Sequence, residues 1–119
     1  MDEDFADPTI TNSPDTDEYA FIGGFVAGEG CFTRSGGRFR FAVALGATDA
    51  VMLDLMRRVL GVGTIRRYGR RKPHYDDEVV LTVMNRRSLV EVVVPFMDRW
   101  LPDSYKRQQY ERWRRDLLG

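Results

Sequence analysis

One carboxylate, Glu29, follows an apolar segment that holds four glycines between residues 22 and 30. A glycine inside a helix costs about 0.5–1 kcal/mol relative to alanine, so this segment needs a structural reason for its composition. Gly24 and Gly28 are four residues apart and share one helix face, which lets a second backbone approach closely. Two copies packed through this face would bring their Glu29 carboxylates together, where they repel unless they hold a cation. The segment therefore predicts a homodimer interface that ends in a metal site.

The position of Glu29 also suggests a chemistry. A carboxylate at the C-terminus of a helix is disfavoured by the helix dipole, so its presence there points to a function. Hydrolysis of a phosphodiester needs a nucleophilic water and neutralisation of the leaving oxygen, and carboxylate-bound divalent ions supply both. Mg²⁺ keeps several of its waters and needs only one or two protein carboxylates, so one Glu29 from each copy is sufficient. We expect Mg²⁺, or Mn²⁺, as the cofactor.

Composition restricts the class of protein. The chain has 119 residues, enough for one domain, and no apolar run reaches the length of a membrane span. Cys31 is the only cysteine, which excludes a disulfide framework and suits a reducing compartment. No signal peptide opens the chain. These features predict a protein without a membrane partner that is cytoplasmic, or associated with organellar or nucleoid DNA, and is not secreted.

The zero net charge hides an asymmetry. Residues 1–18 contain seven acidic residues and no basic one, with two prolines and few apolar groups, so we expect a disordered acidic tail. Residues 19–119 form the predicted domain and carry 18 Lys and Arg against 11 Asp and Glu, a net charge of +7. Sixteen of the 18 basic residues are Arg, whose forked guanidinium matches phosphate and guanine.

Hydrophobic periodicity predicts four helices and four strands. The strands are expected at residues 31–35, 38–45, 64–68 and 78–84, and the helices at residues 19–30, 49–60, 86–100 and 104–118. Thr48 and Asn85 are expected to cap the second and third helices, and Pro95 to kink or shorten the third. The order αββαββα, followed by a terminal helix, predicts a two-layer α+β domain with a saddle-like four-stranded antiparallel sheet. No internal repeat is visible, so the chain has one copy of the glycine-rich helix.

The face of the sheet opposite the helices is predicted to bind DNA. Its expected side chains are polar and include several that contact base edges and phosphates: Thr33, Arg38, Arg40, Thr64, Arg66, Tyr68, Glu78 and Thr82. The loop before the fourth strand adds Arg70, Arg71 and Lys72, which we expect to contact backbone phosphates. The alternative is a sheet face and loop that only meet solvent.

Three segments resemble the LAGLIDADG homing endonuclease family. Residues 22–30, read as Ile-Gly-Gly-Phe-Val-Ala-Gly-Glu-Gly, resemble the motif that gives the family its name. Leu60–Ile65 is similar to the segment that enters the third strand of the family, and Ser104–Tyr110 to the start of its C-terminal helix. The resemblance covers roughly residues 19–118 and implies a single-motif homodimer.

The resemblance also implies roles for individual residues. Glu29 is expected to be catalytic and to bind the metal ion together with the backbone carbonyl of Gly28 or Ala27, and Lys106 is expected near the scissile phosphate. The predicted dimer interface comprises Ile22, Gly24, Phe25 and Gly28.

Two departures from the family pattern bear on activity. Ala27 replaces the first acid of the motif, which is the less essential of the two. Many relatives carry a water-orienting Gln near the end of the second strand, but residues 44–49 contain none, and Thr48 or Asp49 is the possible substitute.

The predicted function is therefore a homodimeric site-specific DNA endonuclease. It would bind a pseudo-palindromic duplex, cut both strands across the minor groove with a divalent metal ion, and serve the mobility of an intron or intein. Two alternatives remain open. One is a non-cleaving DNA-binding protein of the same fold, either a regulator or a maturase-like protein. The other is an interaction protein without a nucleic-acid partner.

Overall fold

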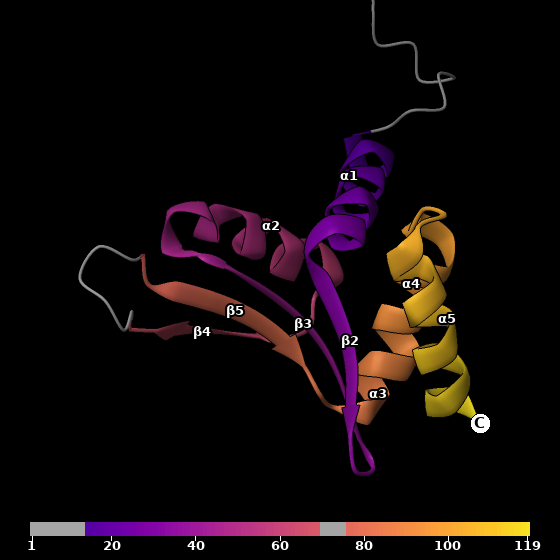
Figure 1. The fold of residues 1–119 in the computed structure, drawn as a ribbon. Helices are drawn as coiled ribbons and strands as arrows, with labels where there is room; N and C mark the ends of the chain where they lie inside the picture. Colours follow the sequence, from indigo (N-terminus) through magenta and orange to yellow (C-terminus); the bar gives the residue numbers. More distant parts are fainter. Residues whose placement is uncertain (1–13, 70–75) are drawn as a thin grey trace, which may run out of the picture.

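The computed structural model describes residues 14–69 and 76–119, and Figure 1 shows their arrangement. The helical segments are α1 (Pro14–Glu29), η1 (Ala47–Asp49), α2 (Ala50–Leu60), α3 (Arg86–Ser88), η2 (Leu89–Val93), α4 (Val94–Trp100) and α5 (Tyr105–Leu118). The strands are β2 (Gly30–Ser35), β3 (Arg38–Gly46), β4 (Thr64–Tyr68) and β5 (Glu78–Val83). Among the described residues, no helix is long and apolar enough to cross a membrane.

The four strands form one antiparallel sheet in the order β2-β3-β5-β4, so β2 and β4 are its edges. The helices lie together on one face of this twisted sheet (Figure 1). The predicted α+β architecture and the order αββαββα with a terminal helix are therefore confirmed. One sheet face is left without a helical cover in the described chain.

The core fills the space between the sheet and the helices. The strict alternation of β3 sends Phe41 and Val43 inward, and both are fully buried, as the sequence predicts. Leu53 and Met56 contribute from α2, and Tyr110 from α5. The Tyr110 hydroxyl donates to the Val94 carbonyl at 3.0 Å, which satisfies its polar atom inside the core. Burial, followed by the hydrogen bond from the Tyr110 hydroxyl to Asp98 and the charge of that carboxylate, raises the pKa of Tyr110.

Helix α1 begins at Pro14, earlier than predicted. Proline is favoured in the first turn of a helix, and acidic side chains are stabilised near a helix N-terminus, so the composition that suggested a tail also suits a helix start. Glu18 lies 3.7 Å from Arg58 of α2, which ties the first turns of α1 to the domain. The predicted tail is thus wrong for residues 14–18, and its remainder, residues 1–13, lies outside the described residues.

Capping agrees with the sequence at one predicted position and not at the other. The Asn85 side chain accepts from the Ser88 N–H at 3.0 Å, so its predicted role as an N-cap is confirmed. Thr48 does not cap α2, because η1 precedes that helix and its N-cap residue is Asp49, which makes no side-chain cap bond. The Thr48 hydroxyl donates instead to Asp76 at 2.6 Å.

The third predicted helix is continuous but irregular. Its middle turn, η2, is a π-helical segment that ends just before Pro95, and α4 follows with Pro95 in its first turn. A proline lacks the N–H that an α-helix would use, and the wider π turn accommodates that loss. The predicted effect of Pro95 is therefore a change of helical winding and not an early end.

Candidate nucleic-acid interface

The eight predicted sheet-face residues lie on one face of the sheet. Directly paired residues in antiparallel strands share a face, and the register pairs Thr33 with Arg40, Ser35 with Arg38, Thr64 with Thr82, and Tyr68 with Glu78. Ala42 pairs with both Cys31 and Thr82, and Val80 pairs with Arg66. These pairs connect the eight residues into one surface that extends over all four strands. We call this surface the open sheet face. It lies opposite the helices and the core.

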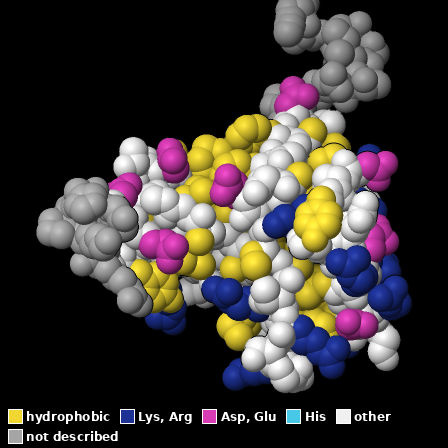
Figure 2. Space-filling model, in the orientation of Figure 1, with side chains coloured by type: hydrophobic (Ala, Val, Ile, Leu, Met, Phe, Trp, Pro, Cys, Tyr) yellow, Lys and Arg dark blue, Asp and Glu magenta, His cyan; other side chains and the backbone are white. Residues whose placement is uncertain are grey.

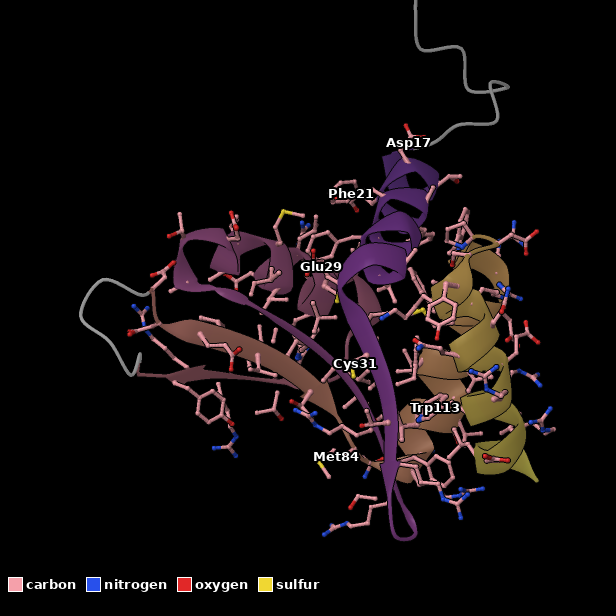
Figure 3. All side chains as sticks on the ribbon, in the orientation of Figure 1. Asp17, Phe21, Glu29, Cys31, Met84 and Trp113 are labelled. Carbon is pink, nitrogen blue, oxygen red and sulfur yellow. The ribbon has the colours of Figure 1, made fainter. Side chains whose placement is uncertain are left out.

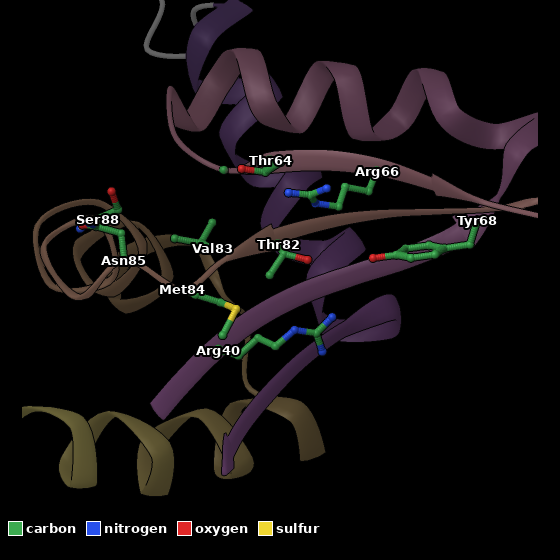
Figure 4. Close-up of a pocket in the computed structure, with 10 residues that line it drawn as sticks. Arg40, Thr64, Arg66, Tyr68, Thr82, Val83, Met84, Asn85 and Ser88 are labelled. Atoms are coloured by element: carbon green, nitrogen blue, oxygen red, sulfur yellow. The ribbon is translucent and has the colours of Figure 1, made fainter. Parts of the chain in front are cut away.

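A shallow hollow of about 390 Å³ crosses the open sheet face. Arg40, Arg66, Tyr68, Thr64 and Thr82 line it, and Figure 4 shows these side chains rising from neighbouring strands into the same space. Within residues 16–69 and 76–119, Arg40 and Arg66 form no ion pair or hydrogen bond through their guanidinium groups. Unpaired guanidinium groups beside hydroxyls present a row of hydrogen-bond donors for an anionic or base-edge partner.

Arg67, the neighbour of Arg66, differs from Arg40 and Arg66 because its guanidinium has a partner within the fold. It points to the other face and donates to Asp77 at 2.8 Å, so its charge is used within the fold. Arg70, Arg71 and Lys72 of the predicted basic loop lie outside the described residues, so their phosphate contacts stay a prediction.

The glycine-rich helix α1 has one bare face. A methyl group placed on Gly24 or on Gly28 would meet no atom within 4 Å, so this stripe faces open space in a single chain. Gly23 lies on the opposite side, where a methyl group would meet the Trp100 carbonyl oxygen at 2.0 Å. The glycines therefore have two uses: Gly23 lets α1 pack against α4, and Gly24 with Gly28 leaves a surface uncovered.

Two aromatic residues flank this stripe. Phe25 is half-buried, and Phe21 is 50% exposed and stacks on it with ring centroids 6.2 Å apart. Hydrophobic side chains gather over α1 and α2 in Figure 2. Phe21 was not predicted, although it is three residues before Gly24 and shares its face. Ile22, by contrast, was wrongly placed at the interface, because it points into its own core and is only 2% exposed.

Glu29 and the contact between Lys106 and Gly30 are adjacent at the end of α1. Glu29 is exposed as the last residue of the helix, and in the described part of the chain its carboxylate has no hydrogen bond or ion pair. Lys106 is the second residue of α5 and is half-buried, and its ammonium donates to the backbone carbonyl of Gly30 at 2.5 Å. Lys106 thus contacts the residue that directly follows Glu29, which Figure 3 labels at the end of α1.

The donor set at this end of α1 suits a hard divalent cation. Glu29 supplies an unpartnered carboxylate, and the last carbonyls of a helix, here including Gly28, lack intrahelical partners. Mg²⁺, Mn²⁺ and Ca²⁺ prefer such oxygen ligands. No group of three or more His, Cys, Asp or Glu that could hold a metal ion occurs among the described residues. One chain therefore offers part of a metal site, and further oxygen ligands would have to come from outside it.

Thr48 cannot readily replace the missing glutamine. Both its hydroxyl and its backbone N–H donate to Asp76, at 2.6 and 2.9 Å. These hydrogen bonds, the hydroxyl first, hold the pKa of the Asp76 carboxyl below its usual value. The Thr48 hydroxyl is therefore used in a hydrogen bond to Asp76, just before β5. Residues 44–47 have no polar side chain that could take its place.

These features describe an α+β protein with an uncovered polar sheet face and an adjacent carboxylate. A family model described as LAGLIDADG endonuclease matches residues 22–116. The match spans most of the chain, and the protein therefore belongs to the LAGLIDADG endonuclease family. The resemblance found in the sequence is confirmed.

Solved structures agree with this assignment. The group I intron-encoded homing endonuclease I-CeuI, complexed with DNA, is 25% identical, with a TM-score of 0.69 over 87% of this chain and 53% of that one. The homing endonuclease I-TnaI is also 25% identical, with a TM-score of 0.70 over 84% of this chain and 71% of that one. The meganuclease I-SmaMI bound to uncleavable DNA is 24% identical, with a TM-score of 0.71, over 91% of this chain.

The chain spans 38% of the length of I-SmaMI and 53% of that of I-CeuI. The likeness to I-SmaMI shows the fold alone. A comparison with curated proteins gives no match.

Proposed function

We propose that two copies of this chain bind a pseudo-palindromic DNA duplex and hydrolyse a phosphodiester in each strand with a divalent metal ion. The observation that carries the proposal is the arrangement of residues at the junction of α1 and β2. There a bare helix face, an unpartnered carboxylate and the open sheet face meet within a few residues: Gly28 at the interface, Glu29 at its end, and Thr33 on the sheet.

The dimer follows from the stripe of Gly24 and Gly28. An uncovered apolar helix face buries itself in a symmetric interface when a second copy presents the same patch. Phe21 and Phe25 would supply the apolar area at its rim. The twofold axis would bring two Glu29 carboxylates together, so the oxygen ligands that one chain lacks would come from its partner and from the DNA phosphates.

The open sheet face is the proposed DNA reader. A twisted antiparallel sheet has the curvature to lie along a major groove, where Arg40 and Arg66 can each donate two hydrogen bonds to guanine. Thr33, Thr64, Thr82, Arg38, Tyr68 and Glu78 complete the contact surface. The related I-CeuI was solved in complex with DNA, which supports a DNA partner for this fold.

Each residue at the end of α1 has a proposed part in the reaction. A divalent ion, when bound, would supply an activated water and neutralise the leaving oxygen. Glu29 and the Gly28 carbonyl would hold that ion, and the ammonium of Lys106, fixed by Gly30, would stabilise charge on the reacting phosphate. One neighbour, I-SmaMI, was solved on an uncleaved DNA target in the presence of calcium ions, which supports a divalent-metal site in the fold.

The test begins with selection of bound duplexes from a random library, followed by addition of Mg²⁺ or Mn²⁺. We expect selected sites with twofold sequence symmetry and metal-dependent cleavage of both strands. Binding without cleavage in either metal would contradict the nuclease proposal. It would favour a non-cleaving DNA-binding protein of the same fold, whose supporting observation is that Thr48, bound to Asp76, cannot stand in for the missing glutamine. Absence of salt-dependent DNA binding would contradict both.

A further inference from the structure

A second hollow, of about 400 Å³, runs along the free edge of the sheet. It lies between edge strand β2 and helix α5, and we call it the β2 edge groove. Its lining residues come from these two elements: Cys31, Phe32, Thr33, Arg34, Gln109, Arg112 and Trp113. Because Thr33 also belongs to the open sheet face, the groove is continuous with the proposed DNA-reading surface.

The walls of the groove are fixed to one another. The Trp113 indole N–H donates to the Thr33 carbonyl at 2.9 Å, and Lys106 donates to the Gly30 carbonyl about two turns earlier on α5. The rings of Phe32 and Trp113 lie 5.1 Å apart, and Trp113 is only 5% exposed. Helix α5 is thus held along β2 at two points, so a side chain between them has a defined position relative to the sheet.

Arg112 and Gln109 are the free donors of this groove. Within the described ranges, the guanidinium of Arg112 and the amide of Gln109 make no hydrogen bond or ion pair. Other arginines of α5 are used by the fold: Arg107 donates to Glu111 at 2.7 Å, and Arg114 donates to Asp98 at 2.9 Å. Lys and Arg side chains gather over α5 and the β2–β3 hairpin in Figure 2, so the groove lies in a basic environment.

The position of the β2 edge groove on the sheet indicates which part of a DNA duplex it would contact. Neighbouring strands are spaced about 4.8 Å apart, so the two edges of a four-stranded sheet are about 14 Å apart. A B-DNA major groove is about 12 Å wide. Because the sheet is slightly wider than the groove, the outer side of β2, which faces α5, lies beside the sugar-phosphate backbone when the strands follow the groove, whereas side chains that rise from the open sheet face point toward the bases. A fork of guanidinium donors with an adjacent amide and hydroxyl matches a phosphate oxygen pair.

We propose that the β2 edge groove binds a backbone phosphate of the same DNA duplex, with Arg112 as its charged ligand and Gln109 and Thr33 as neutral donors. This inference rests on the proposed DNA-binding function and adds a sequence-independent contact to it. Arg112 would fix the position of β2, and hence of the adjacent Glu29, on the duplex.

The first test is the salt dependence of DNA binding by full-length protein. Each phosphate contact contributes about 0.9 to the slope of log K against log salt, so Arg112→Gln should lower the slope by about 0.9 per bound chain. The affinity loss should be the same for selected and random duplexes, because a phosphate carries no sequence. Arg112→Lys keeps the charge and should retain most of the slope.

Arg99→Gln is the matched control. Arg99 is an exposed helical arginine of α4 that lines neither the β2 edge groove nor the hollow of the open sheet face, and its guanidinium lies 5.1 Å above the Trp100 ring. Its substitution removes the same charge and should leave the slope unchanged. An Arg112→Gln slope equal to that of the wild type, with Arg66→Ala still weakening binding to the selected duplex, would overturn the phosphate contact and leave the DNA-binding function standing.

Ethylation interference locates the contact. Ethylation of the phosphate that Arg112 binds should inhibit binding of the wild type and should no longer inhibit Arg112→Gln. An interference pattern that is identical in the two proteins would overturn the proposal. Absence of any salt-dependent binding by the wild type would overturn the underlying function as well, so the two failures are distinguishable.

Discussion

Glu29 occupies an unfavourable place for a carboxylate unless it has a ligand. It lies at the C-terminal end of α1, exposed and without a partner in the described chain. Loss of its charge should relieve an unfavourable interaction with the helix dipole of about 0.3–1 kcal/mol. We therefore expect Glu29→Gln to unfold at an equal or higher temperature than the wild type.

The same substitution should abolish metal-dependent cleavage while DNA binding persists or tightens, because an anion near phosphates has been removed. Asp54→Asn, at an exposed position of α2, is the control and should leave cleavage unchanged. Thermal melting and cleavage of a selected duplex in Mg²⁺ measure the two effects. Cutting by Glu29→Gln at the wild-type rate would show that Glu29 is not the catalytic ligand.

Lys106 allows a second prediction at the residue scale. Lys106→Met removes the hydrogen bond to the Gly30 carbonyl and the proposed donor to the reacting phosphate. Loss of one charge-stabilising donor slows an enzyme by on the order of 10²-fold, whereas duplex affinity should change little. Single-turnover cleavage with saturating protein separates the two effects. Equal losses of binding and of cleavage would indicate that Lys106 only supports the local structure.

Sequence predicted the residues of this site unevenly. Glu29 followed from its unfavourable place at a helix end, whereas Lys106 came only from the family resemblance, because its contact with Gly30 spans 76 positions that no local pattern records. Ile22 was misplaced because a helix motif does not reveal which of its sides meets the core. Thr48 was misassigned for a related reason, since its partner, Asp76, is distant in sequence.

The glycines of α1 test the packing at the scale of one element. Gly23→Ala would place a methyl group 2.0 Å from the Trp100 carbonyl oxygen, and we expect a loss of about 1–3 kcal/mol in the free energy of unfolding. Gly24→Leu meets open space in the single chain, so monomer stability should not fall. In the proposed dimer, however, the leucine would separate the two helices.

Sedimentation and chemical denaturation distinguish these outcomes. We expect Gly24→Leu to sediment as a folded monomer at concentrations where the wild type is a dimer, and Gly23→Ala to be less stable whatever its oligomeric state. A wild type that stays monomeric at micromolar concentration, with and without DNA, would contradict the twofold arrangement through α1.

The contact between Thr48 of the η1 turn and Asp76, which precedes β5, predicts a pH dependence. Hydrogen bonds from Thr48 keep the pKa of Asp76 below its usual 3.8. The stabilisation that this contact gives is therefore complete above pH 3.8 and is lost as the pH falls through the lower pKa of the folded state. Thr48→Val should raise the pKa of Asp76, as measured by a carbon-detected NMR titration of its carboxyl group. Thr33→Val, on β2, is the control and should leave that titration unchanged.

Strands were easier to predict than helix ends. The alternation of β3 and the bounds of β4 follow directly from side-chain periodicity. The start of α1 did not, because acidic residues with a proline suit both a disordered segment and a helix N-terminus. The π segment before Pro95 was also missed, because a proline in the sequence indicates that a helix is disturbed but not how its winding changes.

At the scale of the whole molecule, the proposed dimer would read DNA symmetrically, because each chain contributes one sheet and one motif helix. A twofold dimer presents the open sheet face twice, so each side chain meets two base pairs related by the centre of the site. Arg66 lies in the hollow of this face, and its guanidinium has no partner among the residues that the structure describes. Arg66→Ala should therefore weaken the preference for one base at two symmetry-related positions of the site. Where Arg66 reads guanine, we expect the discrimination against the other bases to fall by about 1–3 kcal/mol at each position.

Selection of bound duplexes with the wild type and with Arg66→Ala measures this change at every position of the site. Arg67→Ala is a suitable control, because Arg67 points to the other face and pairs with Asp77, so base preferences should stay as in the wild type. A change at a single position would indicate that one chain reads the site alone. Unchanged base preferences in both variants would mean that the open sheet face does not read the bases. Its arginines would then contribute to DNA affinity only through their charge, and that contribution would weaken with added salt.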